Sequence, residues 1–549
     1  MKNMIKQIFV LLLLSGLVAC TSSSDKKSDK SEGQKQHRLL NNYEKVTLSP
    51  SLSNLTANQK KMLPLLIDAA KIIDELYWLQ TCGRKAEMKN KVKNEDLLAY
   101  AQINYGPWDR LNNNKPFIDG FKNKPAGANF YPSDMTYEEF EEFNDPEKYS
   151  SYTLIRRNEV GGLQCIPYHQ AYRSKLEKAS ELLSEAAELA DNEDFANYLE
   201  LQAAALLVDD YYRSMVTWMK NEDAILDILI GPIDDEEDDL FWTKKTYQSM
   251  ILLKDKEATA DLERYSLLLP YLQKNLPIEE EFLNEPPEEL SNIMVYDLIY
   301  CSGYWNAASK LITLSMPKDI QVEQEVGSRK LQFKNVMEAK FEKILKPLGE
   351  VVIDESQQKH ITFNAFFENT MFFEIGSALG LSKTFNGEMS IRHALKDHHN
   401  SIMFTKNDIL SLFIITKLYD MGELNEGDLM DNYVTYMTNL FRSIRFGVSN
   451  DQALSNVIIF YYFQEKEAFT RNDKTDQYMV NKENMRKAMN DMAKELLYIQ
   501  GEGNYEEAVK LVEEKGYIRD ELLNDLYRIQ HGNIPKDVAF NQGVEVLEL

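Results

Sequence analysis

Residues 363–380 read FNAFFENTMFFEIGSALG and place apolar side chains at steps of three and four. This spacing is typical of one face of an α-helix. Glu374 falls on the same face, where an unpaired carboxylate is costly to bury. We therefore expect Glu374 to form a structural ion pair with Arg or Lys of a neighbouring helix, or to be a catalytic base or its relic.

The same helical spacing continues through much of the chain. It predicts helices over residues 63–79, 171–189, 198–219 and 247–272, and a long helical block over residues 331–529. Strand signals are fewer and lie earlier in the chain. Residues 152–155 and 163–166 flank a turn-rich segment and predict a hairpin, and residues 225–230 and 310–316 are further candidate strands.

Length, composition and charge limit the possible fold and the possible classes of partner. The chain has 549 residues, of which 44% are hydrophobic and 27% charged, as in globular proteins. Its length exceeds what one hydrophobic core usually serves, so we expect two lobes separated by a cleft. The net charge of -25, without a basic stretch, excludes nucleic acid as an expected partner.

The N-terminus has the pattern of a bacterial lipoprotein signal. Lys2 and Lys6 precede a short apolar run, and Leu-Val-Ala-Cys ends at Cys20. We expect residues 1–19 to be removed and Cys20 to carry the lipid that anchors the protein in the bacterial cell envelope. Thr21, rather than Asp, after this Cys favours the outer membrane. The polar residues that follow, within the range 20–45, predict a flexible tether.

Several common chemistries are excluded by direct search. The chain has no Gly-x-Ser-x-Gly elbow, no phosphate-binding Gly-x-x-x-x-Gly-Lys loop and no EF-hand pattern. The other three cysteines, Cys82, Cys165 and Cys301, are widely separated and predict buried thiols rather than a zinc knuckle. The acidic run DDEEDD at residues 234–239 lacks calcium-loop spacing, so we interpret it as a solvated loop next to a helix N-terminus.

Longer runs resemble a known family. They are INYGPWDR at residues 103–110, KPAGANFYP at 124–132, GPI at 231–233, FENTMF at 367–372 and DLMDNY at 428–433. On these runs the chain resembles the dipeptidyl-peptidase III zinc metallopeptidases, especially a shorter bacterial branch. The resemblance implies an α+β, mainly helical fold. One lobe is mixed with a small β-barrel core (46–255 and 296–330), and the other is mostly helical (256–295 and 331–549).

The resemblance also implies a zinc site, and this chain departs from it. The family motif His-Glu-x-x-His stands here as Phe373-Glu374-Ile375-Gly376-Ser377. The third ligand, the second Glu of a Glu-Glu pair on the next helix, stands as Phe404 after Met403. Phenylalanine has no lone pair, and a neutral Ser hydroxyl is a poor zinc ligand. Zinc is expected for the family and predicted to be absent here, with Glu374 as a relic general base.

Two further family positions have also changed. Gln452 stands at the position of a catalytic His, and Gln cannot carry a proton. Ser315 and Lys318 replace the two Asn residues of an Asn-x-Pro-Asn peptide clamp. These changes favour a non-catalytic lipoprotein that binds short peptides or a protein partner. The alternative is an active zinc-dependent dipeptidyl peptidase, or another hydrolase, with a rebuilt site.

A rebuilt metal site would need histidine ligands near Glu374. His393, His398 and His399 precede Phe404 and would have to join Glu374, but their spacing places no two ligands one helical turn apart. The remaining candidates, His169, His360 and His531, are expected to be structural or surface residues.

Overall fold

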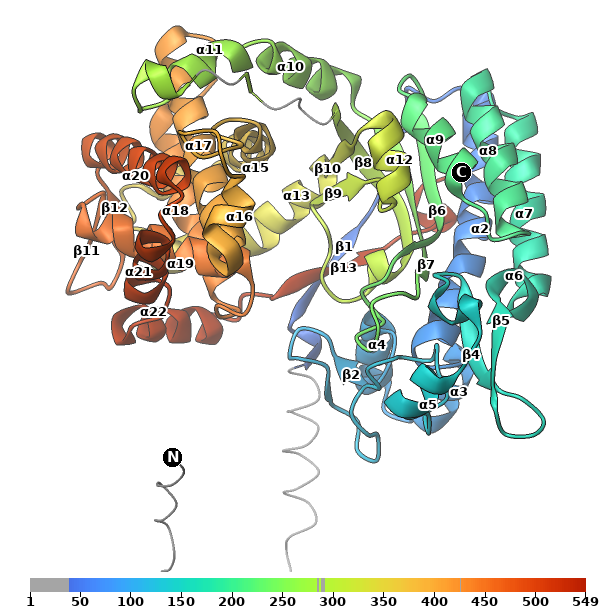
Figure 1. The fold of residues 1–549 in the computed structure, drawn as a ribbon. Coiled ribbons are helices and arrows are strands. Elements are labelled where there is room, and N and C mark those ends of the chain that lie inside the picture. Colours follow the sequence, from blue (N-terminus) through green and yellow to red (C-terminus); the bar gives the residue numbers. More distant parts are fainter. Residues whose placement is uncertain (1–38, 284–285, 288–291, 425) are drawn as a thin grey trace, which may run out of the picture.

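The computed structural model describes residues 39–283, 286–287, 292–424 and 426–549. They form a mixed lobe and a mainly helical lobe (Figure 1). The signal peptide, Cys20 and the tether up to residue 38 lie outside the described residues. Within the described ranges, no helix is both long and apolar enough to cross a membrane.

A five-stranded sheet, curved into a half-barrel, is the centre of the mixed lobe, in the order β6-β7-β8-β10-β9. Its strands are β6 (Leu226–Asp234), β7 (Thr246–Lys254), β8 (Asn292–Gly303), β9 (Thr313–Met316) and β10 (Arg329–Phe333). β6, β7 and β8 are antiparallel, and β10 runs parallel to β8 and antiparallel to β9. Every residue of β6 is buried, so both faces of the sheet are covered there.

Helices cover this sheet on the outer side of the lobe (Figure 1). They are α2 (Ala57–Thr81), α7 (Arg173–Glu188), α8 (Glu193–Leu206) and α9 (Tyr212–Lys220). α2 begins at a capping box in which Thr56 and Gln59 satisfy each other's backbone N–H groups. Shorter elements complete the lobe: α3 (Lys85–Lys91), α4 (Glu95–Asn104), β2 (Trp108–Asp109), β3 (Lys115–Pro116), α5 (Tyr137–Glu142), β4 (Thr153–Arg157), β5 (Leu163–Pro167), α6 (Tyr168–Ala171) and α12 (Ile320–Val326).

The helical lobe is built around α17 (His399–Met421), most of whose side chains are buried. Around it lie α10 (Lys256–Ser266), α11 (Leu269–Lys274), α13 (Lys334–Lys340), α14 (Lys346–Val352), α15 (Phe363–Ser377), α16 (Ile391–Leu395), α18 (Leu429–Ile444), α19 (Asp451–Glu465), β11 (Phe469–Arg471), β12 (Tyr478–Val480), α20 (Lys482–Glu502), α21 (Tyr505–Lys515) and α22 (Asp520–His531).

The two ends of the described chain meet between the lobes. β1 (Tyr43–Thr47) pairs in parallel with β13 (Asp537–Asn541), and both strands run between the lobes in Figure 1. β1 therefore begins inside the range 20–45 assigned to the tether. Asp537 is buried and lies 3.0 Å from Lys340 Nζ of α13, so an ion pair ties β13 to the connection between sheet and helices.

The predicted elements are confirmed in part. The hairpin is β4–β5, and the candidate strands at 225–230 and 310–316 lie on β6 and β9. The helix predicted over 247–272 is wrong, because β7 occupies its first part and α10 and α11 follow. Eight of the nine residues of β7 are buried. An apolar run covered on both faces has no amphipathic period, so it cannot be told from a buried helix.

Candidate functional site

A cavity of about 480 Å³ lies where the β9 end of the sheet faces α15 and α17. Both lobes contribute to its wall. Among its lining residues are Asp234, Glu236, Tyr304, Leu311, Thr313, Leu314, Ser315, Lys318, Lys330, Phe373, Glu374, Ser377, Met403, Phe404 and Asn407. The structure thus brings together all the site residues predicted from the sequence except Gln452 and the lipidated Cys20.

Phe373 and Phe404 stack against each other across the two helices. Their ring centroids are 6.2 Å apart and their planes differ by 16°, which is the geometry of an offset-stacked pair. The helices approach closely because Gly376 lacks a side chain. A Cβ atom there would lie 3.0 Å from the Asn407 carbonyl oxygen. Both rings are only half-buried, so the pair forms an apolar platform on the wall of the cavity.

Glu374 is paired, as its position on the helix requires. Lys330 Nζ donates to Glu374 Oε2, and the two side chains are 21% and 14% exposed. The partner is a residue of strand β10, not of a neighbouring helix as the sequence suggested. A charge-assisted pair in this half-buried setting satisfies the carboxylate.

The residues at the inherited ligand positions do not fit zinc. Two of them are phenyl rings, which offer no lone pair. Ser377 Oγ already donates a 2.6 Å hydrogen bond to the Glu374 carbonyl oxygen of its own helix. Among the described residues, no group of three or more His, Cys, Asp or Glu side chains is arranged to hold a metal ion.

Ser315 and Lys318 line the cavity from the sheet side. Ser315 is exposed on β9, opposite Lys330 of β10. Lys318 Nζ lies 3.7 Å from Asp234 Oδ1. The other oxygen of Asp234 accepts hydrogen bonds from Gln248 and Trp305, each at 2.7 Å. The two amides of the family's clamp are therefore replaced by a hydroxyl and by an ammonium group held near a buried carboxylate.

Gln452 is not part of the cavity wall. Its Nε2 donates a 2.7 Å hydrogen bond to Asp408 Oδ2, one helical turn beyond Phe404 on α17. Burial raises the pKa of Asp408 to about 7, although the Gln452 hydrogen bond opposes the shift. The prediction that groups Gln452 with Glu374 at one site has no support in this arrangement.

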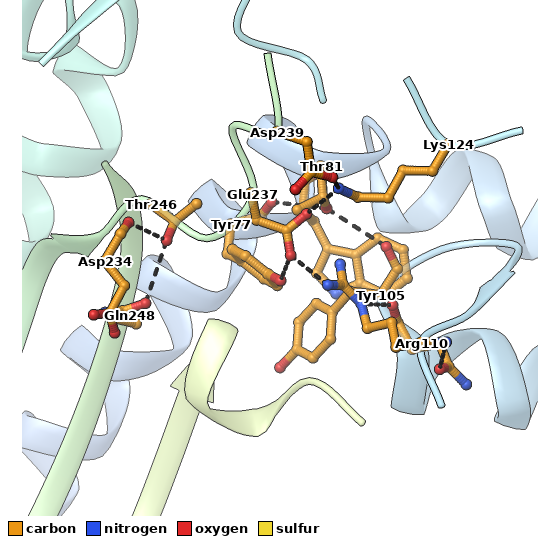
Figure 2. Close-up of polar contacts among 12 residues, drawn as sticks. Tyr77, Thr81, Tyr105, Arg110, Lys124, Asp234, Glu237, Asp239, Thr246 and Gln248 are labelled. Carbon is orange, nitrogen blue, oxygen red and sulfur yellow. Dashed lines mark hydrogen bonds and ion pairs between the residues drawn. The ribbon is translucent and has the colours of Figure 1, made fainter. Parts of the chain in front are cut away.

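Three of the six acids in the run 234–239, namely Asp234, Glu237 and Asp238, are buried, so the interpretation of the run as a solvated loop is wrong for half of it. Figure 2 shows the contacts of Glu237. Glu237 is fully buried and accepts hydrogen bonds from Arg110 and from Tyr77 Oη at 2.6 Å. Lys124 Nζ lies 3.1 Å away. Burial would raise the pKa of Glu237, but the two cations outweigh it and hold the pKa at about 2. No helix follows; the run leads into β7.

This cluster also explains three of the runs that suggested the family. Arg110 belongs to the run 103–110 and Lys124 to the run 124–132, and Glu237 follows the run 231–233 closely. Their side chains join the segment after β6 to two earlier segments of the chain. Two of the runs thus contribute the cations that neutralise Glu237.

The histidines are held by ordinary partners. His169 Nδ1 lies 2.8 Å from Asp209 and His360 Nδ1 lies 2.6 Å from Asp431. His531 Nδ1 lies 2.7 Å from the Tyr527 carbonyl oxygen, so the prediction of structural and surface roles is confirmed for these three. His399 lines a separate cavity behind the aromatic platform, where burial, Arg392 and Lys406 lower its pKa.

The sequence analysis did not assign two residues of the cavity, Asn407 and Glu236, to the site. Asn407 is 4% exposed, lines the cavity, and its Oδ1 has no hydrogen-bond partner in the described part of the chain. Glu236 also lines the cavity, and burial together with Asp234 and Asp235 raises its pKa. Asn407 lies three residues after Phe404 on the same helical face, so the spacing from the third ligand position was the available signal.

Two solved structures share the fold of this chain. No family model matches the chain. A DPP III structure from Caldithrix abyssi is 33% identical, with a TM-score of 0.87 over 92% of this chain and 99% of that chain. Dipeptidyl-peptidase III from Corallococcus sp. strain EGB is 28% identical, with a TM-score of 0.75 over 94% of this chain and 98% of that one.

A curated plant protein also matches. It is called Nudix hydrolase 3, comes from Arabidopsis thaliana, and is 29% identical over 567 residues, covering 91% of this chain and 73% of that protein. Its name describes that protein and assigns no activity to this chain. The near-complete coverage of a structure at 33% identity shows the family. The chain belongs to the dipeptidyl-peptidase III family.

Proposed function

We propose that this protein is a lipid-anchored member of the family that has lost zinc and peptidase activity and binds peptides in its cleft. The observation that carries the proposal is the stacked pair of Phe373 and Phe404 at two inherited ligand positions. Ser377 is a neutral hydroxyl and a poor zinc ligand, so the three positions offer neither the imidazoles nor the carboxylate of the family's site. The Lys330 ion pair further occupies the carboxylate that would act as general base.

The cavity retains features that suit a peptide main chain. β9 is the last strand of the sheet, and in the described residues its only strand partner is β10. Thr313, Leu314 and Ser315 of this strand line the cavity. Unpaired N–H and C=O groups at a sheet edge accept an extended peptide as an added strand.

The side chains around that edge suggest which peptides would bind. The aromatic platform and Met403 offer apolar contact area, and Glu236 adds an exposed carboxylate at the opposite side, where Asp234 is already paired with Lys318. Such a wall favours short apolar or cationic peptides. Attraction to carboxylates is screened by salt, so affinity for cationic peptides should weaken as ionic strength rises.

The cellular setting is also a proposal. The lipobox ending at Cys20 supports an anchor through acyl chains in the bacterial envelope, and Thr21 supports the outer membrane. The partners would be short peptides or a neighbouring protein, with the membrane contacted through the lipid.

Calorimetry with a panel of short peptides tests binding, and metal analysis of the purified protein tests catalysis. We expect apolar and cationic peptides to bind, Phe404→Ala to weaken their binding, and Gln452→Ala, outside the cavity, to leave it unchanged. We also expect far less than one zinc per chain and no dipeptide release from peptide arylamides. Stoichiometric zinc, with turnover abolished in Glu374→Gln, would establish the active hydrolase instead.

A further inference from the structure

An exposed aromatic patch lies on the mixed lobe beyond the buried acidic cluster. It consists of Tyr137, Tyr149, Leu240 and Trp242, which are 62%, 49%, 39% and 61% exposed. Tyr137 and Tyr149 come from α5 and the turn after it, and the other two come from the loop between β6 and β7. Large exposed side chains gathered from two segments mark a candidate interaction surface.

The patch rests on a packed aromatic base. The Phe241 ring stacks on Phe140 at a centroid distance of 4.0 Å and on Tyr137 at 6.1 Å. Phe140 also contacts Tyr149 edge-on at 5.5 Å. The four exposed side chains are thus carried by segments that this base holds together, and they do not depend on a partner for their position.

A buried carboxylate fixes the loop that carries Leu240 and Trp242. Asp238 is fully buried and accepts hydrogen bonds from the backbone N–H groups of Leu240, Phe241, Thr243 and Lys244, at 3.0–3.3 Å. Tyr131 Oη donates to the same carboxylate at 2.8 Å. Trp242 itself has a left-handed backbone with φ of 56°, which is rare for a bulky residue and persists only where the surroundings impose it.

Negative charges outnumber positive ones around the patch. Residues 134–149 contain seven carboxylates and one lysine. That lysine, Lys148, is 9% exposed and donates to the carbonyl oxygens of Phe140 and Glu141. Two carboxylates, Asp134 and Glu139, are paired with Arg157, and most of the others face solvent. The rim therefore attracts cations and repels anionic surfaces.

We propose that the aromatic patch is a preformed docking surface for a cationic polypeptide that presents Arg or Lys beside apolar side chains. Guanidinium groups stack on tyrosine and tryptophan rings, and the acidic rim supplies the complementary charge. A rigid loop lowers the ordering cost of binding, and exposed Trp and Tyr are the residue types that dominate interface energies. This surface is distinct from the cleft and extends the proposed function.

The test uses the full-length protein and a fluorescent peptide in which Arg and Leu alternate. Its binding is measured by anisotropy, with a peptide alternating Glu and Leu as the comparison. We expect the Arg peptide to bind, its affinity to fall with salt, and Trp242→Ala or Tyr137→Ala to weaken it about tenfold or more. The matched control is Tyr527→Ala, because Tyr527 is 58% exposed on the helical lobe.

Five results would overturn the proposal. The first four are absence of binding, equal binding of the Glu peptide, equal weakening by Tyr527→Ala, and weakening by Phe404→Ala alone, which would place the probe in the cleft. Self-association of the wild type that Trp242→Ala abolishes, seen by sedimentation, would make the occupant a second copy and also overturn it. Unchanged circular dichroism spectra of the variants confirm that exposed residues were altered without loss of fold.

Discussion

Restoring two of the three inherited ligand residues should destabilise the helical lobe. In Phe373→His with Phe404→Glu, the stacked rings of α15 and α17 are lost, and a carboxylate is placed beside Glu374. The cavity wall then gains two polar groups in place of the apolar contact between the rings. We expect the double variant to unfold at a lower denaturant concentration than the wild type.

The magnitude follows from the half-buried state of the rings. Removing a fully buried Phe costs about 3–5 kcal/mol, and a stacked pair adds about 0.5–1.5 kcal/mol beyond area burial. Both rings remain partly exposed to the cavity, and the new side chains keep some of the contact area. We therefore expect a loss of about 2–4 kcal/mol in the free energy of unfolding of this lobe.

Denaturant unfolding followed by circular dichroism measures this loss, and a triple variant provides the control. Adding Ser377→His completes the family's ligand set on the same wall. Zinc at about a hundred times its dissociation constant should then stabilise the triple variant by about 2.7 kcal/mol and leave the wild type unchanged. A double variant as stable as the wild type, or a triple variant indifferent to zinc, would refute the alignment of these positions.

Three further predictions address the rest of the chain. Arg110→Met leaves the buried Glu237 with one of its two cations, Lys124, beside the Tyr77 hydroxyl, and should cost about 3–5 kcal/mol at neutral pH. The pKa of Glu237 is held at about 2 in the folded protein, below its unfolded value, so the loss of stability should shrink as pH falls from 5 towards 2. A loss that denaturant unfolding finds to be the same at every pH would contradict this reasoning. Asp408→Asn should stabilise the protein increasingly from pH 4 to about 7. Over this range Asp408 ionises in the unfolded chain but stays protonated when folded, because burial raises its folded pKa to about 7. A difference in unfolding free energy between variant and wild type that does not change with pH would count against this. Cys20→Ala should abolish acyl labelling and membrane fractionation, and unchanged fractionation would exclude the lipid anchor.

The helical part of the fold was predictable because its signals are local. Thr56 and Gln59 cap α2, and Gly501-Glu502-Gly503 ends α20, with Gly503 in the left-handed conformation that glycine tolerates. β7 and β8 are buried on both faces, as β6 is, and carry no alternation of polar and apolar residues. β6 was still predicted because its short apolar run stops at Gly231-Pro232, whereas β7 leads almost directly into α10. The pairing that decides their structure is made with residues far away in sequence.

The candidate site also has contacts that could be predicted from the sequence and contacts that could not. The facing of Phe373 and Phe404 was predictable from the family resemblance, because both stand at positions whose side chains would converge on the family's zinc. The partner of Glu374 was not, since Lys330 reaches it from a strand on the opposite wall. Likewise, nothing within the run 234–239 indicates that Arg110 and Lys124 will neutralise Glu237. Long-range electrostatic pairing leaves no local pattern in the sequence.

The pairing of β1 with β13 has a mechanical consequence for an anchored protein. Any pull on the N-terminus enters the molecule at β1, whose five residue pairs with β13 run parallel to it. A parallel pair loaded along its length must break its hydrogen bonds together and not one after another, so this junction resists tension in shear. Under the proposed anchoring, the load would then reach Asp537, whose ion pair with Lys340 lies at the connection between sheet and helices. The tether would thus be attached where the two lobes meet, and not to the outer end of either lobe.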